Sequence, residues 1–540
     1  MGQKIKTEVA VIGGGITGVG ILRDLALRGI QAILIEKGDL GHGTSTRNHG
    51  LLHSGGRYAV RDPKAAIESC QENWILKKTF PGSIEATDGL FVKVPGDDDS
   101  YVEKWVAACR KLRIPAEEIP VEQVLREEPY VNRDIQAAYR VPDGAVDDFT
   151  LLNDAAEDAE NRGAKVMTYH EATSLLMDGD RVAGVRIRDT LTGEKTTIEA
   201  DLVINASGPW GTKIAEMAGI PLHLVNNKGM LVVFSHRISQ RVINRLRVPG
   251  DGDIFVPSHD VTIFGTTGIN VNDPEDVSLN QEEMEDMLEE GKALIPGIHD
   301  MRLIRAYSGS RPLYQAGGEV GGSSGRNVKR GMALIDHRTR DGIGGLVTIT
   351  GGKLTTFRLM AERTVDLVCE KLGKHVACTT KEETVWRREP QSKFHGIDLA
   401  PAAKHKLVQW SGTAGEQIES SLRAGEKRLV ICECEQVTWA ETESVLANCH
   451  GFQLGDIRRR TRLGMGPCQG TFCNFRATAM AVEEGRATID EANQALRSAI
   501  DERKSGMTVV ATGETARQLC LMQAIYQVSL GIREEVQEHV

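Results

Sequence analysis

The stretch TEVAVIGGGITGVGILRDLALRGIQAILIEKGD, residues 7–39, determines the fold of the N-terminal part of this chain. An apolar strand runs into Gly13-x-Gly15-x-x-Gly18, a helical segment follows, and a second strand ends at Glu36. The first glycine permits a tight turn, the second lets a pyrophosphate approach the backbone, and the third lets helix and strand pack closely. The helix N-terminus faces the phosphates, and Glu36 can accept hydrogen bonds from a ribose diol. The unit predicts a Rossmann-like domain that binds a dinucleotide.

Two later stretches return to the same nucleotide. DLVINASGPWG, residues 201–211, is an apolar strand that ends in small residues, as expected where a chain passes beneath a dinucleotide. GGLVTITGGKLTTFRLMAE, residues 344–362, is a strand, a Gly-Gly turn and the start of a helix whose N-terminus can meet another polar part of the cofactor. A chain whose beginning, middle and end all return to one nucleotide is typical of flavoproteins. We therefore expect FAD.

Length and composition limit the class of protein. A chain of 540 residues is long enough for two or three domains. The net charge of -10 argues against a nucleic-acid-binding protein, which would carry a basic excess. Neither a secretory signal nor an apolar run of about 18 residues is visible, so we expect no membrane-spanning helix. Most of the ten cysteines lack the spacing of a disulfide framework, which favours the reducing cytoplasm.

The pattern along the chain predicts three parts. Residues 1–385 alternate short apolar strands with helical stretches, as α/β domains do. Residues 386–426 lack a clear period and are expected to form a connector. Residues 427–540 are mostly helical and contain four clustered cysteines, so we expect a small, mostly α C-terminal domain there.

Four motifs together carry a resemblance to a known family: GGGITG, GTSTRNHGLLHSGGRYAV, RAYSGSRPL and GGKLTTFRLMAE. The chain resembles the FAD-dependent glycerol-3-phosphate dehydrogenases, and with its C-terminal cysteines it is most similar to the A-subunit type of the anaerobic enzymes. The resemblance implies a Rossmann-like FAD-binding domain with an interleaved, largely antiparallel substrate-binding sheet. It implies oxidation of sn-glycerol 3-phosphate to dihydroxyacetone phosphate. Electrons would pass through an iron–sulfur domain and partner subunits of B and C type to membrane quinone, with the chain cytoplasmic and peripheral on the inner face of the membrane.

Cationic side chains in glycine-rich or turn-like stretches are candidates for binding a phosphate, because a phosphate dianion favours several cationic donors. By the resemblance, Arg57, Arg311, Arg330 and Lys353 surround the substrate. Oxidation at carbon 2 also needs an acceptor for the hydroxyl proton, for which His53 is the first candidate and His49 the second. The residues expected to contact FAD are Gly13, Gly15, Gly18, Glu36, Thr44, Ser45, Thr46, Ala206, Gly208, Gly352, Leu354 and Thr355.

Cys432-x-Cys434 is followed after 33 residues by Cys468-x4-Cys473, and two close pairs of this kind are typical of a metal site. Zinc and iron–sulfur clusters both accept four thiolates. The setting resembles the [2Fe-2S] domain of the bacterioferritin-associated ferredoxin type, although the second pair there commonly has two intervening residues. We expect a [2Fe-2S] cluster, with zinc or no metal as alternatives. Thr438 and Glu441 form a capping-box pattern that predicts a helix after the first pair.

Other interpretations stay open. The stretch DIRRRTRLG, residues 456–464, carries four arginines and is expected to be a solvated face, with contact to an acidic partner as the alternative. An alternative enzyme is a flavin-dependent oxidase or dehydrogenase of an amino or hydroxy acid, whose carboxylate needs one arginine. A third possibility is a non-catalytic protein that binds FAD or serves in assembly. Three or four cations favour the phosphate.

Overall fold

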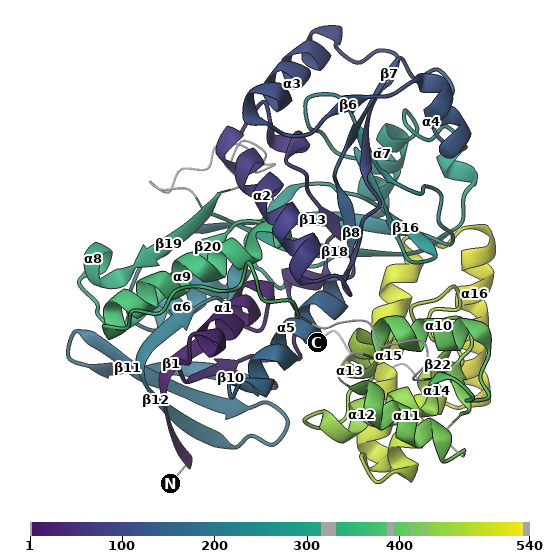
Figure 1. Cartoon of the computed structure of the whole chain (residues 1–540). Helices are drawn as coiled ribbons and strands as arrows, with labels where there is room; N and C mark the ends of the chain where they lie inside the picture. The colour runs from purple at the N-terminus through teal and green to yellow at the C-terminus, as the bar shows by residue number, and fades with distance from the viewer. Residues whose placement is uncertain (1–2, 315–330, 386–393, 412–413, 426–427, 533–540) are drawn as a thin grey trace, which may run out of the picture.

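A computed structural model describes residues 3–314, 331–385, 394–411, 414–425 and 428–532 of the chain. Two large sheets form the body of the molecule, and the C-terminal helices pack against one side of it (Figure 1). This arrangement confirms the α/β fold with an interleaved second sheet and a mostly helical C-terminal region. Among the described residues, no helix combines the length and the apolar character needed to cross a membrane.

The first sheet contains the nucleotide fingerprint. Its strands run in the order β10-β11-β12-β1-β2-β9, with β20 pairing β12 and β19 pairing β20. Strands β1, β2, β9, β12 and β20 are parallel to their neighbours in this group, whereas β10, β11 and β19 pair antiparallel. The strand bounds are β1 Gln3–Ile12, β2 Ala32–Ile35, β9 Lys165–Met167, β10 His170–Asp178, β11 Arg181–Asp189, β12 Lys195–Asn205, β19 Met332–Asp336 and β20 Leu346–Gly351.

Three helices cover one face of this sheet. Helix α1 (Ile16–Leu27) lies between α5 (Asp148–Asn161) and α9 (Phe357–Leu372), and its apolar side chains belong to the same buried cluster as β1 and β20. Gly20 allows α1 and α9 to approach closely, since a Cβ at this position would lie 2.8 Å from the Phe357 ring. The opposite face forms a second cluster with β10, β11 and the short helix α6 (Gly211–Glu216).

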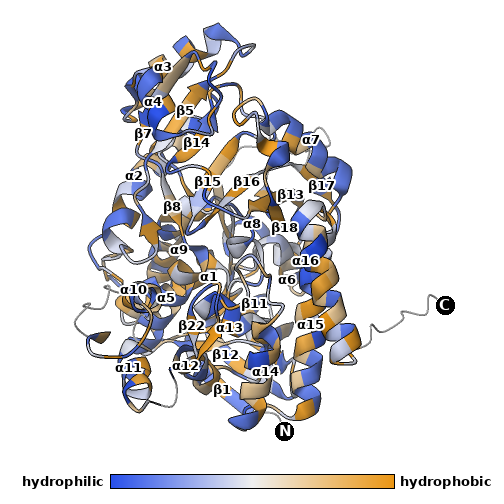
Figure 2. Cartoon of the chain, turned by 90° about the vertical axis from the view of Figure 1, so that its right-hand side faces the viewer, coloured by the Kyte–Doolittle hydropathy of each residue, from blue (hydrophilic) through white to orange (hydrophobic). Residues whose placement is uncertain are grey.

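The second sheet is the interleaved one. It has nine strands in the order β17-β13-β16-β15-β14-β5-β7-β6, with β18 pairing β13, and all of these pairs are antiparallel except β14 with β5. Figure 2 shows hydrophobic residues along β13, β15 and β16 and hydrophilic residues on the outer helices α3, α4 and α7. The strand bounds are β5 Gly89–Lys93, β6 Glu117–Glu118, β7 Ala137–Val141, β13 Leu224–Phe234, β14 Val242–Arg245, β15 Ile254–Ser258, β16 Val261–Gly265, β17 Ile269–Val271 and β18 Leu303–Tyr314.

Shorter elements complete this body. The remaining strands, β3 Leu51–Leu52, β4 Ile84–Glu85 and β8 Gly144–Val146, form a small sheet. The remaining helices are α2 Pro63–Thr79, α3 Asp99–Leu112, α4 Val121–Glu127, α7 Gln281–Gly291 and α8 His337–Asp341. Four 3-10 turns carry the segments predicted for the site, namely η1 Thr44–Thr46, η2 Gly56–Tyr58, η3 Gly208–Trp210 and η5 Leu354–Thr356.

The C-terminal region is helical around the four cysteines. Strands β21 (Val430–Cys432) and β22 (Val437–Thr438) precede α12 (Trp439–Asn448), which begins with the predicted capping box of Thr438 and Glu441. Helices α13 Leu454–Thr461, α14 Cys473–Glu483, α15 Ile489–Thr508 and α16 Gly513–Gln523 follow, and a π-helical turn η8 spans Ala524–Ser529. Within the expected connector, α10 (Pro401–Trp410) and α11 (Gly415–Arg423) share a buried apolar cluster with Ala440 of α12.

A buried carboxylate joins the two parts of the chain. Asp39, which is 2% exposed, accepts hydrogen bonds from the guanidinium groups of both Arg459 and Arg460 at 2.7–2.9 Å. The two arginines lower the pKa of Asp39 well below its usual range. Beside them, the Tyr169 hydroxyl donates to Asp456 at 2.5 Å. The C-terminal domain is therefore held on the first sheet by desolvated charged contacts.

These contacts correct the expectation of a solvated face for residues 456–464. Besides the two arginines that meet Asp39, Arg458 pairs with Glu502 at 2.8 Å and Arg462 pairs with Glu435 at 3.0 Å. The acidic partners lie in the same chain, and the side chains of all four arginines are at most 25% exposed. The run therefore forms an internal interface, which needs its charges paired because isolated buried charges are costly.

Asp39→Asn is expected to destabilise the protein, because it leaves Arg460 in the interface without its counter-charge and Arg459 with Asp456 alone. Breaking a buried pair by removing one partner costs about 3–5 kcal/mol. Urea unfolding followed by circular dichroism should therefore show an earlier transition. Glu199→Gln makes the same chemical change at a pair with Lys4 whose side chains are 37% and 73% exposed, and it should unfold like the parent protein. Equal midpoints for the two variants would contradict an important role for the Asp39 contact.

Candidate functional site

A cavity of about 850 Å³ opens where three parallel strands of the first sheet end. The residues that follow β1, β12 and β20, including Gly13, Ala206 and Gly352, all line it. The crevice outside the carboxyl ends of parallel strands is where α/β sheets bind their ligands. The three stretches that return to one nucleotide in the sequence thus border one cavity.

The glycines of the fingerprint divide into two kinds. Gly13 has φ +117°, and a Cβ there would lie 2.5 Å from the Ala206 carbonyl oxygen. A Cβ at Gly18 would lie 1.9 Å from the Gly13 carbonyl oxygen, so both positions need glycine for the fold itself. At Gly15 an added Cβ would meet only the Ser45 hydroxyl oxygen, at 3.0 Å. Gly15 therefore leaves a cradle open at the N-terminus of α1, which fits a pyrophosphate.

Ser45 and Glu36 shape the same end of the cavity. The Ser45 hydroxyl accepts a hydrogen bond from the Ile16 N–H, the first of α1, at 2.9 Å. The Glu36 carboxylate accepts from the backbone N–H groups of Gly14 at 2.6 Å and Gly38 at 2.9 Å. Burial raises the pKa of Glu36, while these two N–H groups favour its ionised form. A carboxylate has further lone pairs, so Glu36 is suited to accept from a ribose hydroxyl as well.

Most of the predicted cofactor contacts lie in the wall of this cavity. The lining includes Gly13, Gly15, Glu36, Thr44, Ser45, Ala206, Gly208, Gly352, Leu354 and Thr355. Two predicted contacts have other surroundings: Gly18 packs against the Gly13 carbonyl, and the Thr46 hydroxyl donates to the Gly41 carbonyl at 2.5 Å. The cavity size, the open helix N-terminus and the buried acid together fit a bound FAD.

The predicted substrate residues line the same cavity. They are His53, Arg57, Arg311 and Lys353, and the second histidine, His49, joins them. Arg330 lies outside the described residues. Thr355 connects two of the segments, because its hydroxyl accepts the backbone N–H of His53 at 3.1 Å. A residue near the flavin-side turn therefore fixes the loop that carries the candidate base.

Arg311 is held by oxygen acceptors from the second sheet. Its guanidinium donates to the Asn227 side chain at 2.8 Å, to the Thr266 hydroxyl at 2.5 Å and to the Thr267 carbonyl at 3.2 Å. The close approach needs Gly229, where an added Cβ would lie 2.3 Å from Arg311. These neutral acceptors orient the guanidinium without cancelling its charge.

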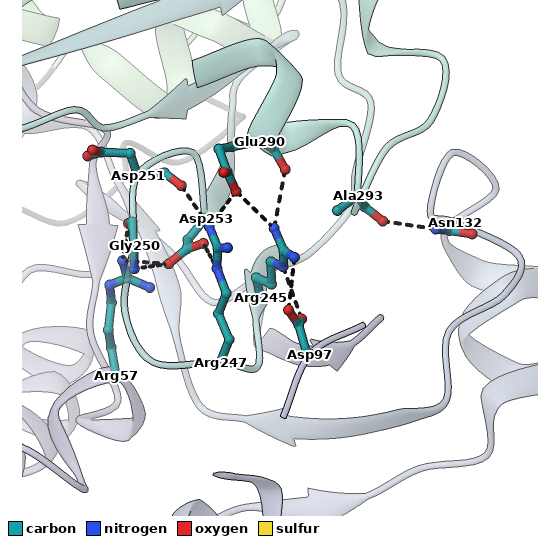
Figure 3. A network of polar contacts seen from close by, with 10 residues as sticks. All are labelled: Arg57, Asp97, Asn132, Arg245, Arg247, Gly250, Asp251, Asp253, Glu290 and Ala293. Carbon is teal, nitrogen blue, oxygen red and sulfur yellow. Dashed lines mark hydrogen bonds and ion pairs between the residues drawn. The ribbon is translucent and has the colours of Figure 1, made fainter. Parts of the chain in front are cut away.

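A second arginine is positioned through a carboxylate (Figure 3). The Arg57 Nη2 donates to the Gly250 carbonyl and to Asp253, both at 3.2 Å. The Asp253 side chain is fully buried and also accepts from Arg247 at 2.9 Å, which in turn pairs with Glu290 at 2.8 Å. The other nitrogens of the Arg57 fork make no described contact, so they are available to an anion in the cavity.

The candidate base has defined neighbours. The Tyr58 hydroxyl lies 3.4 Å from His53 Nε2, and the Lys353 ammonium lies 4.6 Å from the centre of the Tyr58 ring. Burial, together with Arg311 and Arg57, lowers the pKa of His49 to about 3. His49 is therefore neutral at physiological pH and a weak proton acceptor. Of the two histidines, His53 is the better placed to receive a proton.

Several residues of this end of the cavity were not predicted from the sequence. Tyr58 directly follows Arg57 and could have been chosen for that reason alone. Asn227, Thr266 and Asp253 carry no local signal, because strand β13 and the loops after β14 and β16 show only the usual alternation or turn composition. Their partners lie 45 to 196 residues away in the chain, so only the folded structure brings them together.

The four late cysteines approach one another in pairs. Cys434 and Cys468 have their sulfurs 3.6 Å apart, and Cys473 lowers the pKa of Cys432 through a side-chain hydrogen bond. The hydrogen bond from Cys434 likewise lowers the pKa of Cys468, and backbone N–H groups of Gly470, Thr471 and Phe472 add to this effect. The described residues contain no group of three or more His, Cys, Asp or Glu side chains arranged to hold a metal ion. The donor chemistry fits a four-thiolate centre, while the sulfurs stand as two pairs.

Gly15→Val is expected to yield folded protein without FAD, because the side chain would occupy the cradle meant for the pyrophosphate. The φ of -78° at Gly15 is accessible to valine, so the backbone is not strained. Absorbance of the purified protein near the flavin bands measures the result. Gly297→Val is the matched control, since an added Cβ there meets nothing within 4 Å. A Gly15→Val protein that retains its full complement of FAD would refute this placement.

Comparisons with known proteins agree with this geometry. Residues 8–367 match the family described as FAD dependent oxidoreductase. The chain is 41% identical over 534 residues to the A-type subunit of the anaerobic glycerol-3-phosphate dehydrogenase of Escherichia coli K12, covering 98% of both chains. It is 38% identical over 547 residues to the A1-type subunit of the anaerobic glycerol-3-phosphate dehydrogenase of Haloferax volcanii, covering 99% of this chain and 92% of that one.

Solved structures share the fold at lower identity. The glycerol-3-phosphate dehydrogenase from Bacillus halodurans, complexed with FAD, aligns with a TM-score of 0.64 at 22% identity, over 93% of this chain and 95% of that one. Glycine oxidase from Geobacillus kaustophilus aligns with a TM-score of 0.56 at 20% identity, over 72% of this chain and 100% of that one. With a family match that spans most of its length, the chain belongs to the FAD-dependent oxidoreductase family.

Proposed function

We propose that this protein oxidises sn-glycerol 3-phosphate to dihydroxyacetone phosphate with FAD, as the catalytic component of an anaerobic glycerol-3-phosphate dehydrogenase. The observation that carries the proposal is the set of three cations, Arg57, Arg311 and Lys353, on the wall of the FAD cavity beside His53. The relatives that are about 40% identical over nearly the whole chain bear the name of this activity. Substrate and chemistry are inferred from these two facts together.

Each side chain has a role in this reaction. When bound, FAD supplies the acceptor for the hydride on carbon 2. Arg57 and Arg311 bind the phosphate oxygens through charge-assisted hydrogen bonds, and Lys353 adds a third positive charge. His53 accepts the proton of the carbon-2 hydroxyl, with Tyr58 holding its ring. The phosphate is thus bound from three segments, namely β18 of the second sheet, the turn after β3 and the turn after β20, and the segment after β3 also carries the proton acceptor.

The charge at the site decides between substrate classes. Glycine oxidase shares this fold, and an amino or hydroxy acid presents one carboxylate of single negative charge. A phosphate ester carries more charge and offers three oxygens, so it matches three cationic donors better. Arg311 and Arg57 both add to the lowering of the His49 pKa that burial causes, so the two guanidinium groups contribute positive potential to the cavity. A dianionic substrate relieves that potential more fully than a carboxylate does.

Electrons leave, on this proposal, through the cysteine domain. Cys432, Cys434, Cys468 and Cys473 hold a [2Fe-2S] cluster, which supplies one-electron transfer between the flavin and the next carrier. Partner subunits of B and C type then pass the electrons to membrane quinone. The protein is bound through these partners to the inner face of the cell membrane. The subunit designation in the names of the relatives and the two cysteine pairs support this part of the proposal.

Arg311→Ala is expected to raise the KM for glycerol 3-phosphate, because losing one charge-assisted contact to a buried phosphate costs about 1.5–3 kcal/mol, roughly tenfold to 150-fold in binding. The visible spectrum should show unchanged FAD content. Arg338→Ala, at a pair with Asp180 whose side chains are 57% and 70% exposed, is the control and should behave like the parent enzyme. Glycerol should be a very poor substrate, and turnover of glycerol close to that of its phosphate would overturn the phosphate site.

The double variant Cys432→Ser/Cys468→Ser is expected to lose iron and acid-labile sulfide, because it removes one thiol from each pair. Glycerol 3-phosphate should still bleach the flavin in one anaerobic turnover, while electron transfer to a quinone with partner subunits present should fail. Cys70→Ser/Cys520→Ser changes two thiols outside the cluster site and should keep iron and turnover. Normal quinone reduction by the first double variant would exclude the relay role.

A further inference from the structure

Arg503 is buried without a full set of partners in the middle of helix α15. Its side chain is 2% exposed, and Nη1 donates to the Gln469 side chain at 3.2 Å. Nε and Nη2 have no hydrogen-bond partner among the described residues. An arginine stays protonated in proteins, and a buried unpaired charge is costly. No described carboxylate accepts a hydrogen bond from Arg503, so the position favours a further negative charge nearby.

The surroundings of Arg503 add further positive charge. Burial lowers the pKa of Arg503, and repulsion from Arg458 and Arg305 lowers it further. Each of these two arginines leaves its own Nε without a hydrogen-bond partner among the described residues. The nearby carboxylate is Glu502, whose side chain is 61% exposed and is already paired with Arg458 at 2.8 Å. Water molecules could satisfy the open N–H groups, but water does not neutralise a charge. One carboxylate thus faces three guanidinium groups.

The cysteine site lies beside these three guanidinium groups. Gln469, which receives the Arg503 hydrogen bond, directly follows Cys468 in the chain and is fully buried. Cys473 begins α14, which packs against α15, and its thiolate would raise the pKa of Arg503 by attraction. The Tyr526 hydroxyl donates to the Gly470 carbonyl of the same loop at 3.0 Å. Arg503 therefore lies in direct contact with the residue after Cys468, on the helix that packs against the helix begun by Cys473.

We propose that Arg503 is the buried counter-charge of a [2Fe-2S] cluster held by the four cysteines and that it raises the reduction potential of that cluster. This inference rests on the cluster of the proposed function. Four thiolates make such a centre anionic, and reduction adds one more negative charge. A fixed cation nearby stabilises the reduced form more than the oxidised form, since the attraction grows with the charge. Electron transfer from reduced flavin toward the cysteine domain becomes more favourable as a result.

The test is a redox titration of the purified full-length protein, followed by the electron paramagnetic resonance signal of the reduced cluster. Iron and acid-labile sulfide are assayed first in each sample. Arg503→Gln and Arg503→Met remove the charge and should lower the midpoint potential by about 59 mV or more, which is tenfold in the equilibrium constant for one electron. Arg503→Lys keeps the charge and should stay near the parent value. Arg517→Gln removes a charge from a side chain that is 79% exposed and should change nothing.

The possible outcomes distinguish a failure of the counter-charge role of Arg503 from a failure of the [2Fe-2S] cluster itself. A parent protein without iron and sulfide, or with zinc in their place, overturns the cluster and the inference together. Parent-like potentials in both neutral variants overturn the inference alone and leave the cluster intact. Loss of iron from both neutral variants but not from Arg503→Lys supports the counter-charge, because charge is then what assembly requires. Loss from all three variants counts against it, because packing is then the decisive property.

Discussion

The meeting of three parallel strand ends at one edge of the first sheet is the constraint on which the site depends. Strand β12 pairs with β1 on one side and with β20 on the other, so the residues after all three strands emerge together. Gly13 turns there with φ +117°, and the Ala206 backbone, just after β12, leaves no space for a side chain at this position. Segments more than 300 residues apart, such as those of His53 and Thr355, are then joined by a single hydrogen bond. The pairing of these strands therefore sets the relative positions of the cavity residues that directly follow them.

Charge is distributed unevenly in this acidic protein. The chain has a net charge of -10, yet guanidinium groups gather at the substrate end of the cavity and behind the cysteine loop. The two arginines proposed to bind the substrate have different contacts. Arg57 shares the buried carboxylate of Asp253 with Arg247, whereas Arg311 donates to the side chains of Asn227 and Thr266 and to the Thr267 carbonyl.

Local features of the sequence predicted their own structure well, and long-range contacts escaped prediction. The strand–glycine–helix unit, the turn before Lys353 and the capping box of Thr438 depend on neighbours within a few residues, so their chemistry is visible in the sequence. The arginine run at 456–464 gave the wrong expectation because its carboxylate partner Asp39 lies 420 residues earlier for Arg459. Asn227 likewise lies inside a strand. The alternation of apolar and polar residues there predicts which side chains are buried, but it does not predict a contact with an arginine 84 residues away.

The turn after β2 serves both halves of the molecule. Glu36 at its start lines the FAD cavity and accepts the N–H groups of Gly14 and Gly38, while Asp39, three residues later, binds the arginines of the cysteine domain. Residues 36–39 therefore link the acid that lines the cavity to the domain interface. Buried ion pairs thus hold the cysteine domain beside the turn that borders the flavin cavity, as the proposed electron transfer between them requires.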